Sequence, residues 1–301
     1  MLNWLWPQKS VQGQVVLITG GAMGIGRLMA LRFAELGAVV LIWDIDAPCG
    51  LQVVQEIASV SGGSEAHFYE VDVADRDRVR ATGRQVLEKF GLVDILVNNA
   101  GIVSGKPLLE TSSRTIERVL AVNTLAHFWT VRTFLPAMLE RYKGHIVCIS
   151  SAAGLFGFPN MVDYGASKFA TVGFMCSLRQ ELRALDKRSI HLTLVCSSFI
   201  KTGMFEGVKA PMFTTWLSPG YAADQIVKAV RRNQWRLLMP SLIALLELLV
   251  ALTPYWVYDF MMRITRTLEA MTHFQQTRVH PDLANSEPRF ADLQADGSER
   301  S

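Results

Sequence analysis

The chain has 301 residues, of which half are hydrophobic and 19% are charged, and its formal net charge at pH 7 is +3. This length allows one large domain or two small ones with a sizeable core. Basic residues form no run longer than a pair such as Arg231-Arg232, so no nucleic-acid partner is expected. The apolar composition predicts an apolar patch on the surface. The four cysteines are isolated, which fits reduced thiols in a cytosol-facing protein and supports neither a disulfide framework nor a metal site.

Residues 1–12 form an apolar N-terminal segment that Pro7, Gln8 and Lys9 interrupt. The segment is too short and too polar for a signal peptide or a spanning helix. Its first six residues, which include Trp4 and Trp6, form either a small interfacial anchor or a segment that packs on the surface of the domain.

From Gln14 onward, short apolar runs alternate with longer amphipathic segments. The short runs are expected to be buried strands: 15–18, 39–43, 66–71, 95–97, 145–149 and 190–195. The longer segments are expected to be helices: 25–36, 75–90, 113–140 and 162–185. Each helix is long enough for a right-handed crossover between parallel strands. The pattern predicts an α/β fold for residues 13–240, with one doubly wound parallel sheet and helices on both of its faces.

Residues with useful chemistry directly follow five of the predicted strands. They are Gly20, Asp44, Asp72, Asn98 and Ser151. Doubly wound sheets bind ligands at the carboxyl ends of their strands, so we expect these residues to meet at one edge. Residues 19–26 also form a glycine-rich turn with the spacing Gly-x-x-x-Gly-x-Gly. Such a turn lets the backbone approach a pyrophosphate, which the positive end of the following helix attracts.

Three further residues, Asn123, Tyr164 and Lys168, extend this pattern. Tyr164 and Lys168 are four residues apart, Ser151 stands thirteen residues before Tyr164, and Asn123 lies further upstream. Together with the glycine spacing and the sequence Asn-Asn-Ala-Gly at 98–101, this set resembles the classical short-chain dehydrogenase/reductase family over residues 14 to about 239. The resemblance implies a single Rossmann-like domain, a nicotinamide dinucleotide cofactor and interconversion of an alcohol and a carbonyl.

The same resemblance implies a role for each catalytic residue. Tyr164 is the general acid/base, and Ser151 hydrogen-bonds the substrate oxygen. Lys168 holds the nicotinamide ribose, and Asn123 positions a water that relays protons to Lys168. The pKa of free tyrosine is near ~10, too high for an efficient base at neutral pH. Lys168, on the same helix face at i+4, is expected to lower it.

The cofactor is expected to be NAD, with NADP less favoured. The Asp44 carboxylate can accept hydrogen bonds from an adenosine ribose and would repel a 2′-phosphate. No basic residue stands at Ala22 or Met23, where NADP-preferring relatives often carry one. The alternative for Asp44 is a helix N-cap or a turn residue.

The family pattern also implies a set of cofactor contacts. The residues that match are Gly20, Gly24, Ile25, Gly26, Asp44, Asp72, Val73, Asn98, Ala100, Gly101, Tyr164, Lys168, Ile200 and Thr202. Within this set, Asp72 and Val73 match an adenine-contacting position, and Asn98 matches the asparagine that braces the central strand. Where the family usually has proline after the sixth strand, this chain has Ser197, so the turn that follows lacks the stiffness of proline.

Bulky apolar residues are expected around the substrate: Phe156, Phe158, Met161, Met204, Phe205, Met212, Phe213 and Trp216. The substrate-binding residues are expected to be Ser151, Tyr164, Phe158, Met204 and Phe205. A pocket of this kind predicts a lipophilic alcohol or ketone. For any single aromatic residue, packing in the core is the alternative.

Residues 241–275 form a hydrophobic helical appendage, followed at 276–301 by a polar tail that is expected to be disordered. Glu247 and two prolines interrupt the apolar stretch, so no spanning helix is predicted. The appendage lies in a membrane interface, or it forms a subunit interface or a lid. The residues expected at headgroup level are Arg231, Arg232, Trp235, Arg236, Tyr255, Trp256, Tyr258, Arg263 and Arg266. The appendage and the Trp-Asp-Ile at 43–45 resemble the membrane-associated branch that includes retinol dehydrogenases and 17-beta-hydroxysteroid dehydrogenases.

These features predict an NAD-dependent oxidoreductase that interconverts a lipophilic alcohol (a retinoid, steroid or long-chain alcohol) and its carbonyl. We expect it to face the cytosol and to associate peripherally with a membrane. The resemblance to this family also implies a homo-oligomer. One alternative is an NADP-linked ketone or 3-oxoacyl reductase. An alternative of another class is a weakly active lipid-surface binding protein, and an epimerase or dehydratase is disfavoured because the chain has no room for its larger substrate domain.

Overall fold

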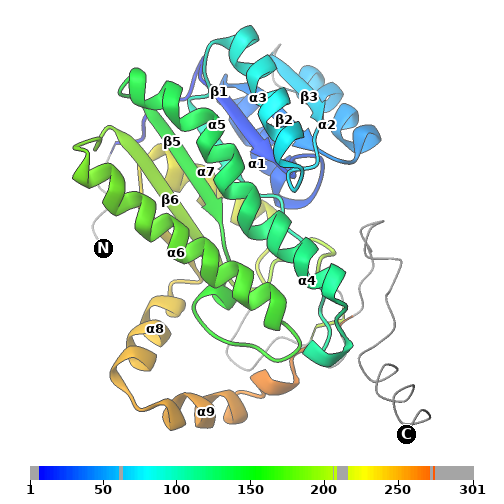
Figure 1. Cartoon of the computed structure of the whole chain (residues 1–301), viewed down its shortest axis with the longest axis vertical. Helices are drawn as coiled ribbons and strands as arrows, with labels where there is room; N and C mark the ends of the chain where they lie inside the picture. Colours follow the sequence, from blue (N-terminus) through cyan, green and yellow to red (C-terminus); the bar gives the residue numbers. More distant parts are fainter. Residues whose placement is uncertain (1–6, 61–63, 206, 209–215, 272–273, 275–301) are drawn as a thin grey trace, which may run out of the picture.

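The computed structural model describes residues 7–60, 64–205, 207–208, 216–271 and 274. A seven-stranded parallel sheet forms its centre, with the strand order β3-β2-β1-β4-β5-β6-β7 (Figure 1). The strands are β1 (Val15–Thr19), β2 (Val39–Asp44), β3 (Ala66–Glu70), β4 (Ile95–Asn98), β5 (Gly144–Ile149), β6 (Ile190–Ser197) and β7 (Arg236–Met239). The predicted doubly wound α/β fold is therefore confirmed. The predictions for residues 1–6, Met212, Phe213 and the tail at 276–301 lie outside the described residues.

Helices cover both faces of the sheet. They are α1 (Gly24–Glu35), α2 (Ala47–Val60), α3 (Arg76–Phe90), α4 (Ser113–Leu120), α5 (Ala126–Glu140), α6 (Val162–Ala184) and α7 (Pro219–Arg231). Residues of α1, α2 and α7 pack together on one face, and residues of α3, α5 and α6 pack on the other. Short turns of helix lie at η2 (Leu108–Glu110) and η4 (Ala152–Gly154).

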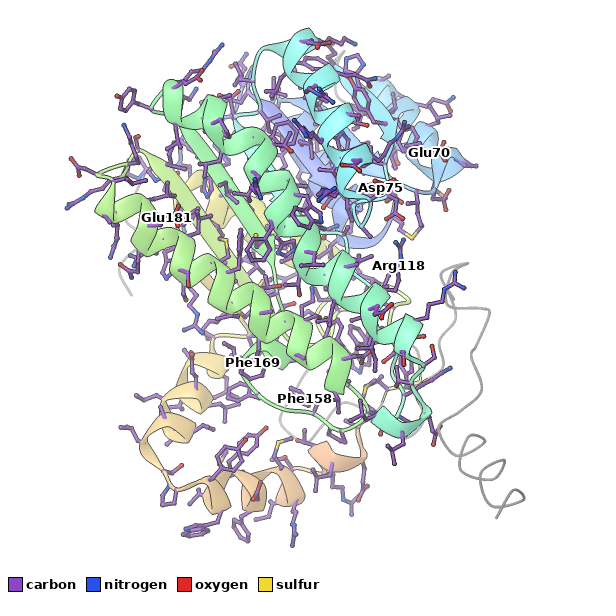
Figure 2. All side chains as sticks on the ribbon, viewed as in Figure 1. Glu70, Asp75, Arg118, Phe158, Phe169 and Glu181 are labelled. Carbon is purple, nitrogen blue, oxygen red and sulfur yellow. The ribbon has the colours of Figure 1, made fainter. Side chains whose placement is uncertain are left out.

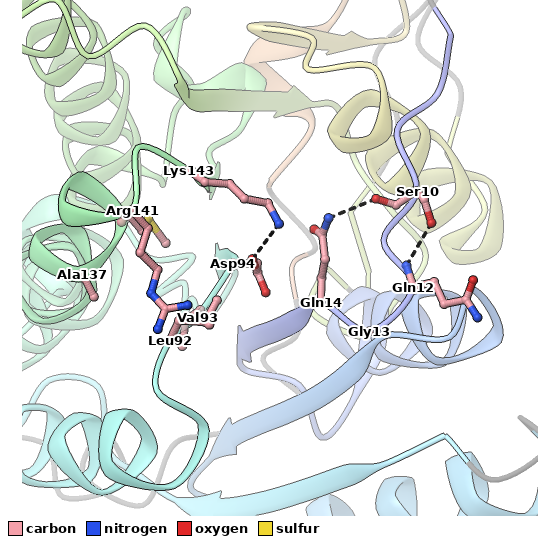
Figure 3. A pocket seen from close by; sticks show the side chains of 11 residues that line it. Ser10, Gln12, Gly13, Gln14, Leu92, Val93, Asp94, Ala137, Arg141 and Lys143 are labelled. Atoms are coloured by element: carbon pink, nitrogen blue, oxygen red, sulfur yellow. Dashed lines mark hydrogen bonds and ion pairs between the residues drawn. The ribbon is translucent and has the colours of Figure 1, made fainter.

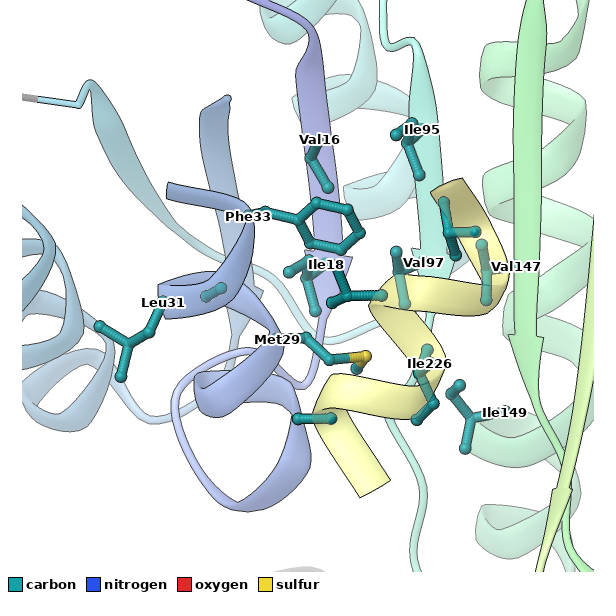
Figure 4. Packing of buried hydrophobic residues seen from close by; sticks show 14 of the residues in the cluster. Val16, Ile18, Met29, Leu31, Phe33, Ile95, Val97, Val147, Ile149 and Ile226 are labelled. Carbon is teal, nitrogen blue, oxygen red and sulfur yellow. The ribbon is translucent and has the colours of Figure 1, made fainter. Parts of the chain in front are cut away.

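Strand β1 shows how the two faces are built. Side chains alternate across a strand, so Val16 and Ile18 join the first cluster and Leu17 joins the second. On the first face, Met29 and Phe33 of α1 pack against β1 (Figure 4). All five side chains of β1 are buried, which explains its continuous apolar sequence.

Several elements differ from the sequence-based expectation. Strand β3 was expected to be buried, but it lies at the edge of the sheet and its side chains are half-buried or exposed. The helix predicted at 113–140 is interrupted by a π-helical turn, η3 (Ala121–Leu125), between α4 and α5. Helices α2 and α7 and strand β7 are not among the predicted elements. Strand β7 is only four residues long and its side chains are only partly buried, so its apolar signal is weak.

After β7, the chain leaves the sheet and forms an arm made of α8 (Leu242–Leu252), α9 (Tyr255–Ile264) and η5 (Thr267–Glu269). Figure 1 shows this arm at one end of the molecule, away from the sheet. In the part of the chain that the structure describes, no helix combines the length and apolar character needed to span a bilayer. The same described residues include no cluster of three or more His, Cys, Asp or Glu side chains that could hold a metal.

Candidate active site

The glycine turn closes tightly on itself at the carboxyl end of β1. Gly20 and Gly24 have positive φ values of 64° and 56°, which glycine adopts without strain. A Cβ on Gly20 would lie 2.8 Å from the Cα of Ala100, and a Cβ on Gly26 would overlap the carbonyl oxygen of Gly20. No acidic residue occupies the first turn of α1, so the positive end of this helix is available to an anion. The turn therefore fits a bound pyrophosphate.

Two residues that sequence reasoning missed hold this turn in place. Asn99 donates from its side-chain amide to the carbonyl oxygens of Thr19 (2.9 Å) and Gly20 (3.0 Å). The hydroxyl oxygen of Thr19 accepts from the backbone N–H groups of Asn99 (3.0 Å) and Ala100 (3.1 Å). These bonds join the ends of β1 and β4. The tandem asparagines were the available signal, because adjacent side chains at a strand end point in opposite directions.

Asn98, by contrast, points into the core. Its side chain is 1% exposed, accepts from the hydroxyl of Thr130 (2.8 Å) and donates to the sulfur of Cys148 (3.7 Å). This arrangement agrees with a role in bracing the central strand. It does not bring the side chain to the surface of the cofactor groove.

Asp44 lies at the end of β2, beside the glycine turn. Its carboxylate accepts from the backbone N–H groups of Ala22 (2.9 Å) and Asp46 (3.1 Å). Burial raises the pKa of Asp44, and these backbone hydrogen bonds oppose the rise. The helix N-cap role falls to Asp46 instead, whose side chain accepts from the backbone N–H of Cys49 (2.9 Å) as α2 begins.

The next strand end places Asp72 near α4. Its carboxylate accepts from the N–H of Ala74 (3.0 Å) and pairs with Arg118 (2.8 Å). Figure 2 labels Arg118 on α4, on the side of the molecule where β3 ends. Val73 is buried in the core cluster beside α3, so its backbone is the part that remains for a ligand.

Asn123 lies in the π-helical turn and is fully buried. Its side chain exchanges two hydrogen bonds of 2.9 Å with the backbone of Ile102 and donates to the hydroxyl of Ser167 (3.0 Å). Its backbone carbonyl accepts from Thr171 (3.1 Å). The extra residue of a π turn widens the helix locally, which frees this carbonyl to bond with α6.

Tyr164 and Lys168 lie on α6 as predicted, with the Lys168 ammonium 5.5 Å from the centre of the Tyr164 ring. Lys168 donates to the carbonyl oxygen of Ile149 (3.0 Å) at the end of β5. A Cβ on Gly101 would lie 3.4 Å from Asn123 and 3.5 Å from the Lys168 ammonium. Glycine at this position therefore keeps space open next to Asn123 and Lys168.

The pKa of Tyr164 differs from the expectation. Burial raises it to about 12, and the hydrogen-bonding interaction with Ser151 acts in the opposite direction. The predicted lowering by Lys168 is not seen, because burial also lowers the pKa of Lys168 to about 8 and its ammonium is directed to Ile149. An additional positive charge near the phenol is required before it can act as a base at neutral pH.

The segment after β6 returns to the glycine turn. A Cβ on Gly24 would lie 3.6 Å from the Cβ of Thr202, so these two residues face each other. Ile200 is buried and forms a bridge with Leu217, which ties the segment to the start of α7. Ile25 packs against the core through its side chain. The predicted cofactor contacts at Gly24 and Thr202 are thus close in space.

A cavity of about 420 Å³ lies next to Ser151. Its walls come from the loop before α6, the segment after β6, and the arm. Predicted substrate residues Phe158 and Phe205 line it, and Tyr164 packs edge-on against Phe205 with ring centres 6.0 Å apart. In Figure 2 the loop that carries Phe158 lies between the body of the domain and the arm. Most of the remaining lining residues are apolar.

Met204 was predicted to bind the substrate, but it does not line this cavity and is 39% exposed. Phe205 takes the inward position in the same turn, because adjacent side chains cannot both face inward. Trp216 also lies outside the lining and packs on Phe199 instead. The cavity wall formed by the arm includes Ile243, Tyr258 and Thr267, which are not among the predicted substrate contacts, although a lid is one of the alternatives given for residues 241–275.

A second cavity, of about 650 Å³, lies at the opposite edge of the sheet (Figure 3). It is lined by residues before β1 and β4 and at the end of α5, among them Gln14, Asp94 and Arg141. The Asp94 carboxylate accepts from the N–H of Val15 (2.9 Å) and pairs with Lys143 (3.3 Å). Although this cavity is larger, none of the glycine-turn or catalytic-motif residues line it. Ligands of such sheets bind at the other edge.

Comparison with known proteins agrees with this geometry. A family model described as short chain dehydrogenase matches residues 14–212. Short-chain dehydrogenase/reductase family 16C member 6 from Bos taurus is 45% identical over 77% of this chain and 74% of its own length. Epidermal retinol dehydrogenase 2 from Homo sapiens is 42% identical over 82% of this chain and 81% of its own length.

Solved structures agree as well. A short-chain dehydrogenase/reductase from Burkholderia phymatum, in complex with NAD, is 28% identical with a TM-score of 0.72, covering 79% of this chain and 92% of that one. A metagenomic short-chain oxidoreductase in complex with NADP is 30% identical with a TM-score of 0.65, covering 76% and 96%. The chain therefore belongs to the short-chain dehydrogenase/reductase family, on the branch that contains retinol dehydrogenases, and it is an NAD(P)-dependent alcohol dehydrogenase/reductase.

Proposed function

We propose that this enzyme oxidises a lipophilic alcohol, such as a retinoid, steroid or long-chain alcohol, with NAD as cofactor, and that Tyr164 is its general acid/base. One observation carries the proposal: Ser151 lines the apolar cavity, and Tyr164 packs on Phe205, which lines the same cavity. The polar group of a substrate would therefore meet the acid/base pair while its apolar part fills the cavity. Relatives named retinol dehydrogenases support this substrate class.

The described residues fit a dinucleotide. The glycine turn would hold the pyrophosphate, Asp44 the adenosine ribose, and Lys168 the nicotinamide ribose. Asp44 supports NAD over NADP, because a 2′-phosphate would approach a carboxylate that already accepts from Ala22 and Asp46. Bound at this place, an oxidised nicotinamide supplies a hydride acceptor and a positive charge.

The chain's own residues would then move the proton. Ser151 holds the substrate hydroxyl, and Tyr164 takes its proton as the carbon loses hydride. The ordinary pKa of tyrosine and the burial of Tyr164 both oppose ionisation, and Lys168 alone does not offset them, so the positive charge of a bound cofactor would have to favour the phenolate. Asn123, which lies in the π-helical turn, positions a water molecule that relays protons to Lys168. Carbonyl reduction follows the same path in reverse.

The test is Tyr164→Phe, with Tyr221→Phe as the matched control, since Tyr221 is half-exposed on α7. We expect turnover of retinol with NAD to fall about 10²- to 10⁴-fold in Tyr164→Phe, and NAD affinity, measured by calorimetry, to stay unchanged. The control should match the parent enzyme. A Tyr164→Phe enzyme as active as the parent would remove the tyrosine from the mechanism.

Measurements of cofactor affinity and of alcohol turnover also distinguish this function from two alternatives. An NADP-linked ketone or 3-oxoacyl reductase would bind NADPH more tightly than NADH, against the interpretation of Asp44. A weakly active lipid-surface binding protein would bind NAD but turn over none of the retinoid, steroid or fatty alcohols. Ser151 follows β5, and Tyr164 and Lys168 of α6 lie at the carboxyl end of the same strand, which favours the enzyme.

We also propose that residues 13–240 are the catalytic domain, that residues 241–275 act as an appendage to it, and that the enzyme works peripherally at a membrane on the side of the cytosol. The apolar character of the cavity and of the arm supports the last point. A homo-oligomer through α5 and α6 stays a prediction, which the mass of the purified enzyme in detergent would test.

A further inference from the structure

The arm has two apolar faces. One face forms part of the cavity wall through Ile243, Leu246 and Met261. The opposite face is exposed: Leu248 is 55%, Leu252 74%, Trp256 68% and Phe260 57% accessible. In α8 and α9, which the structure describes in full, Ile243 is the one buried residue. A surface this apolar is costly to leave in water, so it is expected to meet a partner.

The exposed face has the composition of a membrane-interface surface. Tyr255 and Trp256 occupy the junction between α8 and α9, where their rings are 71% and 68% exposed. Arg263 and Arg266 are exposed at the far end of α9. Aromatic rings at headgroup level and arginines against anionic lipids are typical of helices that lie in a bilayer surface. Helices of 11 and 10 residues are too short to cross the bilayer.

Glu247 and Tyr258 of the arm are engaged on its inner side, whereas Asp259 of α9 is exposed. Glu247 pairs with Arg236 of β7 (2.8 Å), so its charge does not oppose insertion. Tyr258 donates its hydroxyl to the carbonyl oxygen of Gly157 (2.8 Å) and stacks on Phe156. Trp235 lies under the Arg179 side chain. The prediction that Trp235, Arg236 and Tyr258 sit at headgroup level stays a prediction, and in the structure these three side chains contact the domain.

We propose that the exposed face of α8 and α9 docks on the surface of a lipid bilayer, and that the substrate enters the cavity from the lipid through this arm. A single layer of helix separates the exposed face from the cavity, so an apolar alcohol moves from lipid to Ser151 without crossing water. This proposal rests on the proposed function for the identity of the substrate, but the docking surface itself does not.

The test uses the full chain with vesicles of phosphatidylcholine, alone or mixed with phosphatidylserine. The double variant Leu252→Ser, Trp256→Ser removes two exposed apolar side chains from the arm. The matched control, Leu51→Ser with Leu185→Ser, removes two that are 53% and 57% exposed elsewhere. We expect vesicle binding to fall at least about tenfold in the arm variant and to stay unchanged in the control. Phosphatidylserine should strengthen binding of the parent.

Activity tests the entry route. For retinol embedded in vesicles, kcat/KM should fall with vesicle binding in the arm variant, whereas kcat/KM for a short water-soluble alcohol should match the parent. Equal vesicle binding by parent and arm variant would overturn the docking surface. The docking surface would also be overturned if neither protein bound vesicles and the parent were a dimer while the arm variant were a monomer. That result would assign the exposed face to contact with a second copy of the chain. If the parent turned over neither alcohol, the proposed function would fail while vesicle binding still decided the docking surface.

Discussion

The sheet and the arm use apolar residues in opposite ways. In the sheet, Trp43 and Phe134 are fully buried and their rings pack 5.7 Å apart. In the arm, the most exposed large side chain of α8, Leu252, is 74% accessible. Interior packing stabilises the fold, because removing buried side chains costs both transfer and cavity energy. The arm contributes little to this core, and its packing instead shapes a cavity. The main core of the sheet and the part of the cavity wall that the arm supplies are thus located in different parts of one chain.

The largest expected effect is a loss of stability when a buried side chain of the sheet core is removed, and it tests the comparison between sheet and arm. Phe134→Ala leaves a cavity between α5 and β2, and we expect it to lower the free energy of unfolding by about 3–5 kcal/mol. Leu252→Ala, on the exposed face of the arm, should change it by less than ~0.5 kcal/mol. Urea denaturation followed by tryptophan fluorescence measures both. Similar losses in the two variants would mean that the arm is part of the stabilising core.

The buried Lys168 offers a second test, which is the pH dependence of the free energy of unfolding. The pKa of Lys168 is about 8 in the folded protein and 10.5 ordinarily, because burial disfavours the ammonium. Below pH 8 Lys168 is protonated in both the folded and the unfolded state, so the full free-energy cost of burying its ammonium is present. Between pH 8 and 10.5 the unfolded state binds more protons, so the contribution of Lys168 to stability rises with pH. Each pKa unit corresponds to about 1.4 kcal/mol.

Comparison with Lys168→Met isolates this contribution. Without cofactor, the variant should be more stable than the parent at pH 7, and the difference in the free energy of unfolding should shrink as pH approaches 9.5. Other titrations cancel in the difference. A gap that is constant from pH 7 to 9.5 would show that this lysine does not titrate in that range.

The smallest effect concerns the contact between the two regions. Tyr258→Phe removes the hydrogen bond to Gly157 and keeps the ring on Phe156. We expect about 0.5–1.5 kcal/mol to be lost from the docking of the arm. Limited proteolysis near residues 253–254 should accelerate, and KM for a lipophilic alcohol should rise. The thermal midpoint of the sheet should not change. Tyr255→Phe is the control, since Tyr255 is 71% exposed. A lowered thermal midpoint in Tyr258→Phe would contradict the separation of the two regions.

Much of the domain follows from local patterns in the chain. Runs such as that of β1 are apolar because both faces of the strand are covered, so the order of strands and helices can be predicted. Since carboxyl ends of parallel strands share one edge, the convergence of the glycine turn, Asp44 and Ser151 follows as well. The i+4 spacing of Tyr164 and Lys168 places them on one helix face.

Other features depend on contacts between segments that are far apart in the chain. Which of Asn98 and Asn99 faces the glycine turn, and which of Met204 and Phe205 faces the cavity, depends on neighbours that the spacing does not specify. The direction of the pKa shift at Tyr164 depends on the total burial of the phenol, which one nearby lysine does not reveal.

The amino-acid sequence by itself therefore determined the parallel sheet and the placement of the residues that we propose to be catalytic, because both depend on periodicity and order along the chain. Only the tertiary structure decided that residues 242–267 close the cavity that begins at Ser151, because this contact joins elements about a hundred residues apart. Hydrophobic burial is not directional, so an apolar helix carries no record of the surface against which it packs.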